Sequence, residues 1–160
     1  MHAFCKLVTL GVVVAFASAV AVTVSAQTNP HFGTWKMNAA KSTFSPGPAQ
    51  KSETIVYAAA GQGVKFSAEG VNGDGSKFAV AYTANYDGRD VLITGAIDID
   101  AVSLKRINAT AVEETGKKSG KVVRIITDVV SADGKSLTST WKGVNAEGQA
   151  VNNVIVYGRQ

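Results

Sequence analysis

Glycine-containing turns divide this chain at short, nearly even intervals, and this feature most constrains the fold. The turn sequences are "GQG" from residue 61, "NGDG" from 72, "DG" from 87, "SG" from 119, "DG" from 133 and "EG" from 147. Asn-Gly and Asp-Gly pairs supply the positive backbone angles of tight hairpin turns. Between the turns, apolar and polar residues alternate, as in "VKFSAEG", where Val64, Phe66 and Ala68 share one face. A period of two predicts strands with one buried face.

The alternation predicts about ten strands joined by short loops, which makes consecutive strands antiparallel neighbours. The expected ranges are 32–38, 52–59, 64–70, 76–86, 90–95, 101–107, 110–117, 121–131, 136–142 and 151–158. No proline follows Pro48, so every later strand keeps the backbone N–H groups that a ladder needs. Closing the sheet removes both exposed edges. We predict an all-β, up-and-down antiparallel barrel of about 8–10 strands. A sandwich is the alternative, although it usually needs long crossover connections.

Residues 1–26 read as a secretory signal peptide. Lys6 precedes an apolar run at 7–24, and small residues at Val24 and Ala26 suit cleavage after Ala26. We expect one barrel domain at 27–160, exported to the periplasm or secreted, with no stable membrane insertion after cleavage. An uncleaved membrane anchor is the alternative, because 18 apolar residues can just span a bilayer.

The composition of residues 27–160 argues against several functions. Cys5 is the only cysteine of the chain, and His31 is the only histidine after residue 26. These residue types are too few for a metal site or for nucleophilic catalysis, so we expect no metal, no cofactor and no catalytic residues. Basic residues outnumber acidic ones by only 15 to 12 over 27–160, and they cluster only in "GKKSGK" at 116–121. We expect no nucleic-acid partner.

The stretch "FGTWK" at 32–36 resembles the Gly-x-Trp signature that opens the first strand of calycin barrels, the lipocalins and fatty-acid-binding proteins. The resemblance implies that Trp35 plugs the closed end of the barrel. It also implies that Arg159, near the end of the last strand, packs across the indole, while Gly33 allows close backbone approach. An ordinary core tryptophan is the alternative.

Two longer stretches, at 33–65 and 133–160, resemble small secreted bacterial proteins that have no assigned activity and are sometimes described as lipocalin-like. This resemblance implies a bacterial, exported barrel. It implies no catalytic residues.

The predicted inward face is apolar and aromatic, which is typical of a lipophilic pocket. It comprises Tyr57, Phe66, Phe78, Val80, Tyr82, Val102, Leu104, Arg106, Val123, Ile125, Leu137 and Trp141. Phe44, in the proline-rich loop, either dips into the open mouth or holds the loop onto the rim. Arg106 either faces inward as the partner of a ligand carboxylate or reaches water at its strand end. The candidate ligand-binding residues are Phe44, Tyr57, Phe66, Phe78, Tyr82, Leu104, Arg106 and Trp141.

Two functions follow from these expectations. In the first, the barrel binds a small hydrophobic ligand in its interior, either neutral or acidic, and catalyses nothing. In the second, side chains fill the interior, and the barrel acts as an envelope structural or protein-interaction module.

The signal-peptide prediction has a direct test. N-terminal sequencing of the protein recovered from its own cells is expected to begin at Gln27. An intact Met1 in the mature protein would contradict export by cleavage.

Overall fold

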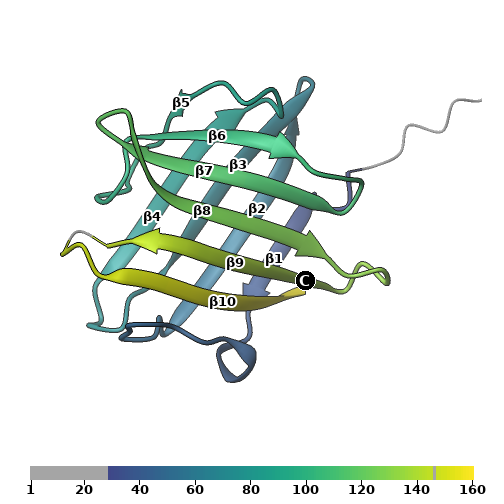
Figure 1. The fold of residues 1–160 in the computed structure, drawn as a ribbon. Coiled ribbons are helices and arrows are strands. Elements are labelled where there is room, and N and C mark those ends of the chain that lie inside the picture. The colour runs from purple at the N-terminus through teal and green to yellow at the C-terminus, as the bar shows by residue number, and fades with distance from the viewer. Residues whose placement is uncertain (1–28, 146) are drawn as a thin grey trace, which may run out of the picture.

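The structure, a computed structural model, describes residues 29–145 and 147–160 and consists of ten antiparallel strands that curl into a nearly closed barrel (Figure 1). The predicted signal peptide lies outside the described residues. Within the part of the chain that the structure describes, no helix is long and apolar enough to cross a bilayer.

The strands match the predicted ranges closely. Their bounds are β1 Gly33–Met37, β2 Ser52–Ala60, β3 Gly63–Val71, β4 Lys77–Ala84, β5 Val91–Leu92, β6 Ala101–Arg106, β7 Ala111–Lys118, β8 Lys121–Val130, β9 Ser136–Val144 and β10 Ala150–Arg159. A 3-10 turn, η1, covers Ala39–Lys41 in the loop between β1 and β2. The predicted all-β, up-and-down barrel is therefore confirmed.

The two ends of the strand sequence meet in one ladder. The strand order is β4-β3-β2-β1-β10-β9-β8-β7-β6-β5, so β1 pairs with both β2 and β10. Trp35 in β1 stands opposite Ile55 in β2 and Arg159 in β10. Pairing of the first and last strands gives the inward side chains one common enclosed space.

Among the described residues, the remaining seam of the barrel is closed by isolated bridges, which pair Ala81 with Thr94 and Asp87 with Lys105. Ala81 in β4 and Thr94 exchange two backbone hydrogen bonds, with N···O distances of 3.1 and 2.9 Å. The expected strand at 90–95 is only the two-residue β5, because the chain leaves β6 after Leu92 and crosses to β4 at Thr94. This seam is the least extensively bonded part of the barrel wall.

The predicted inward direction is wrong for Ile125 in β8, whereas Val123, which was also predicted to face inward, is half-buried and packs against the core. Ile125 is exposed, whereas Arg124, Ile126, Asp128 and Val130 are the residues turned toward the interior or partly so. The reason is a bulge: Gly116 in β7 pairs with Arg124 while Lys117 pairs with Val122, so Val123 is the extra residue. An extra residue in one strand of a pair changes which of its alternate side chains point into the barrel on one side of the bulge.

The closed end of the barrel brings together the three residues named from the Gly-x-Trp motif. Trp35 is fully buried, and the guanidinium carbon of Arg159 lies 4.0 Å from its ring centroid. The same guanidinium donates to the carbonyl oxygens of Phe32 at 2.7 Å and Pro30 at 2.6 Å. Gly33 has a φ of +129°, and a Cβ there would lie 2.8 Å from Nη1 of Arg159. A larger residue at position 33 would therefore displace the cation from the indole.

Truncating Trp35 tests this end of the barrel. Trp35→Ala is expected to lower the free energy of unfolding by about 3–5 kcal/mol, because it empties a fully buried aromatic site. Urea unfolding monitored by circular dichroism measures the loss. Trp141→Ala provides a matched control at a half-buried indole, and a loss near zero for Trp35→Ala would show that the plug is not structural.

Candidate functional site

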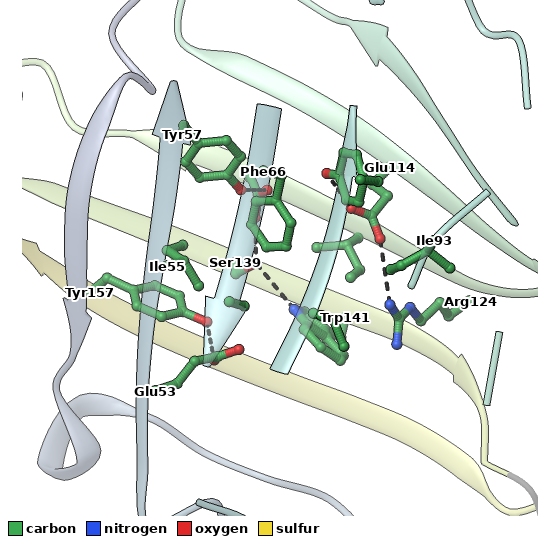
Figure 2. Close-up of a pocket in the computed structure, with 15 residues that line it drawn as sticks. Glu53, Ile55, Tyr57, Phe66, Ile93, Glu114, Arg124, Ser139, Trp141 and Tyr157 are labelled. Carbon is green, nitrogen blue, oxygen red and sulfur yellow. Dashed lines mark hydrogen bonds and ion pairs between the residues drawn. The ribbon is translucent and has the colours of Figure 1, made fainter. Parts of the chain in front are cut away.

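A cavity with both apolar and polar walls lies inside the barrel (Figure 2). The volume open to the centres of water molecules is about 40 Å³. At about 10–15 Å³ for each water on this measure, the space suits about three waters or one very small organic molecule. Its apolar walls are Ile55, Phe66, Ala68, Val80, Ile93, Ile126 and Trp141, and its polar walls are Glu53, Tyr57, Tyr82, Glu114, Arg124, Asp128, Ser139 and Tyr157.

An aromatic column forms one side of the cavity. Tyr57, Phe66 and Tyr82 are cross-strand neighbours on β2, β3 and β4. Their ring centroids are 5.0 Å apart for Tyr57 and Phe66 and 4.8 Å apart for Phe66 and Tyr82, the second pair being stacked. Aromatic pairs at these separations add to the stability that area burial gives. The column therefore presents rigid ring faces and two hydroxyl groups to the opposite wall.

Asp128 is the buried acceptor at the centre of this arrangement. Tyr57 donates its hydroxyl to Oδ2 of Asp128 at 2.8 Å, and the hydroxyl of Ser139 donates to Oδ1. The indole of Trp141 donates in turn to Oγ of Ser139 at 3.1 Å. Burial raises the pKa of Asp128 to about 6, although both hydroxyl donors oppose the shift.

Glu114 and Arg124 connect the interior to the barrel rim. Tyr82 donates to Oε2 of Glu114 at 2.8 Å, and Nη2 of Arg124 lies 3.5 Å from Oε1 of the same carboxylate. Nη1 of Arg124 also binds Asp98, in the loop between β5 and β6, at 3.1 Å. The guanidinium lies 4.8 Å from the ring centroid of Trp141. Arg124 thus bridges an interior carboxylate and a loop carboxylate.

A glycine gives Arg124 the room it occupies. A Cβ on Gly116, its partner on β7, would lie 2.8 Å from Cγ of Arg124. The bulge and this glycine together allow a long cationic side chain to turn inward.

Glu53 is the third carboxyl group of the cavity. It is 4% exposed, and Tyr157 donates to its Oε2 at 2.5 Å. Burial raises the pKa of Glu53 to about 7, and the Tyr157 hydrogen bond opposes that shift. Among the described residues, none donates a hydrogen bond to Oε1, and Figure 2 shows this second oxygen directed away from Tyr157. Glu53 therefore offers a free acceptor inside the barrel.

A smaller space lies toward the closed end, beyond Tyr57, Tyr82 and Asp128. It measures about 10 Å³ and is lined also by His31, Tyr86, Leu104 and Val112. His31 is 1% exposed, with Nε2 3.4 Å from the backbone oxygen of Asp128. Burial lowers the pKa of His31, which favours its neutral form.

The structure brings only part of the predicted ligand-binding set together. Tyr57, Phe66, Tyr82 and Trp141 line the cavity, and Leu104 lines the smaller space. Phe44 and Phe78 are half-buried and pack against the core outside the cavity lining.

Arg106 takes the second of its two predicted positions. It is exposed at the end of β6, with its guanidinium 4.1 Å from the ring centroid of Tyr86. It does not line the cavity, because the strand ends there and the long side chain turns outward over the ring.

Sequence reasoning did not find Glu53, Glu114, Arg124 and Asp128. Asp128 gave a signal, since a lone carboxylate stands between valines and isoleucines in "RIITDVV" at 124–130. The part of the chain that the structure describes contains no group of three His, Cys, Asp or Glu side chains arranged to hold a metal ion.

Comparison with known proteins supports the fold. No family model matches this chain, and no curated protein matches it. A crystal structure of Rv2717c from M. tuberculosis matches with a TM-score of 0.52 and 12% identity, covering 82% of this chain and 93% of that one. The zebrafish ileal bile acid-binding protein complexed with cholic acid matches with a TM-score of 0.49 and 9% identity, covering 82% of this chain and 99% of that one.

The architecture defines the class. A nearly closed antiparallel barrel of ten strands, with the first and last strands paired, is a calycin-type barrel. The predicted calycin-like fold is therefore confirmed.

The raised pKa of Glu53 predicts a specific pH dependence of stability. The pKa of this carboxyl is about 7 in the folded state and 4.5 in the unfolded state, so the native protein holds the proton more tightly. The contribution of Glu53 to the free energy of unfolding therefore declines as the pH rises from 4.5 to 7. Glu53→Gln removes this decline. At pH 8 the variant is expected to be more stable than the wild type by about 3 kcal/mol, and at pH 5 by less than about 1 kcal/mol.

Urea unfolding at the two pH values measures the difference. Glu69→Gln is the matched control, because it removes an exposed carboxylate from β3. An equal gain at pH 5 and pH 8 would show that Glu53 does not titrate as described.

Proposed function

We propose that this chain is an exported, non-catalytic binding protein whose barrel interior holds one small molecule. The observation that carries the proposal is the set of buried ionisable groups around the cavity. Buried charges and carboxyl groups are costly, and apolar residues of similar volume often give equal or greater stability. Perturbed pKa values also gather at functional sites. A barrel interior that only filled space would have less need of three carboxyl groups.

The size of the cavity limits the ligand. Pockets for drug-sized molecules usually measure about 300–1,000 Å³, whereas this cavity offers about 40 Å³ to the centres of water molecules. At about 10–15 Å³ for each water on this measure, a ligand of about three or four non-hydrogen atoms suits the space as it stands. A longer lipophilic molecule would require half-buried Phe66 or Trp141 to move toward the rim.

The charge of the lining argues against the acidic ligand considered from the sequence. Glu53, Glu114 and Asp128 face the cavity. Arg124, the only cation of the lining among the described residues, pairs through Nη1 with Asp98 and through Nη2 with Glu114, while its buried Nε has no hydrogen-bond partner. An added carboxylate would meet like charges in a low-dielectric space.

A filled barrel that acts through its surface is the second candidate. The small cavity volume favours it, since most of the interior is occupied by side chains. Export rests on the predicted signal peptide and is proposed for both candidates. Catalysis is not proposed, because both ring nitrogens of His31 already have partners, Oδ1 of Asn29 and the backbone oxygen of Asp128.

Native mass spectrometry of gently purified protein separates the two candidates. We expect the wild type to carry or take up a small molecule from an extract of its own cells. Ala68→Leu should abolish uptake, because Ala68 is 4% exposed and lines the cavity. Ala58→Leu, on the exposed face of β2, is the matched control and should retain uptake. A clean mass for the wild type, with no uptake, would favour the filled barrel.

A further inference from the structure

The cavity joins an aromatic wall to an acidic wall, and its inner part lacks a positive charge. The only cation that lines it, within residues 29–145 and 147–160, is Arg124. Arg124 forms ion pairs with Glu114 and Asp98, and neither Glu53 nor Asp128 is in an ion pair among the described residues. With all three carboxyl groups ionised, the interior would hold two uncompensated negative charges.

One acceptor points into this space without a donor. Glu53 is 4% exposed, its Oε2 is taken by Tyr157, and its Oε1 has no hydrogen-bond donor among the described residues. Oε1 is not among the fully enclosed polar atoms that lack a partner, so it reaches the open space of the cavity. Because Glu53 lines the cavity, a group bound there can supply the missing hydrogen bond.

The opposite wall suits a cation as well. Ring faces attract ammonium groups, and aromatic cages are a known means of recognising them. Tyr57, Phe66 and Tyr82 form a continuous column beside the carboxyl groups. Acceptors on one side and ring faces on the other match an organic cation with a short apolar body.

We propose that the cavity selects a small primary ammonium ion, which donates to Oε1 of Glu53 and packs its alkyl part against the aromatic column. This inference rests on the proposed function of the same cavity and adds the chemical class of the ligand. The cavity volume limits the alkyl part to a few carbon atoms.

Protonation of Glu53 should make binding of the cation depend on pH. The groups that face Glu53 are Tyr157 on β10 and Asp128 and Arg124 on β8. Burial keeps Glu53 protonated up to a pH of about 7, and a protonated carboxyl cannot compensate an ammonium charge. Binding of the cation should therefore strengthen between pH 5 and pH 8 and release protons.

The test compares three probes of matched chain length: propylammonium, propan-1-ol and propionate. Chemical-shift titration of ¹⁵N-labelled protein at pH 8 measures each affinity. We expect propylammonium to bind at least about tenfold more tightly than propan-1-ol, a factor that corresponds to about 1.4 kcal/mol. Propionate should bind most weakly. The propylammonium affinity should fall about tenfold at pH 5.

Two variants test the assignment to Glu53. Glu53→Gln keeps the shape of the side chain and should remove the preference for propylammonium over propan-1-ol. Glu69→Gln, on the exposed face of β3, should retain it. Asp128→Asn provides a second interior variant, and it should weaken propylammonium binding because it removes a neighbouring negative charge.

The outcomes separate this inference from the proposed function. Equal binding of propylammonium and propan-1-ol, or tightest binding of propionate, would overturn the cation preference and leave interior binding intact. No binding of any probe, together with a clean native mass, would overturn both. An unchanged preference in Glu53→Gln would overturn the role of Glu53.

Discussion

The pairing of β1 with β10 is the constraint on which the rest of the structure depends. It joins the two ends of the strand sequence, so the inward faces of all ten strands share one enclosed space. Arg159 reinforces the joint because its guanidinium covers Trp35 and binds the carbonyl oxygens of the segment before β1. The enclosed space shields its lining from bulk water, and this burial raises the pKa of Glu53 to about 7 and the pKa of Asp128 to about 6.

The interior carboxyl groups give the barrel its chemical character. Each accepts a hydrogen bond from a tyrosine on another strand: Glu53 from Tyr157, Glu114 from Tyr82 and Asp128 from Tyr57. These bonds offset part of the cost of burial and also hold the carboxyl groups at fixed positions. A fixed set of acceptors facing aromatic rings favours a bound partner that carries donors or positive charge. The fold resembles calycin barrels, whereas the proposed ligand preference comes from these particular residues.

Much of the fold, and the aromatic half of the site, was predictable from the sequence. Tyr57, Phe66, Tyr82 and Trp141 lie on strands where apolar and polar residues alternate clearly, so their inward direction followed from a period of two. The acidic half was not predictable, since a charged residue in an alternating pattern is normally assigned to the solvent face. Arg106 shares the alternation of its strand but lies at its end, where the side chain reaches solvent.

The sequence by itself determined the positions of the strands and their antiparallel order, because glycine turns and alternation are local properties of the chain. The residues at the closed end were implied by the resemblance of "FGTWK" to the calycin signature. Only the tertiary structure decided which charges the interior contains. In β8 both faces are rich in apolar residues, and the bulge opposite Gly116 and Lys117 selects which of them turns inward. The inward face of β8 therefore depends on how β8 pairs with β7, and the sequence of β8 alone does not show that pairing. The pairing places Arg124 and Asp128 inside the barrel.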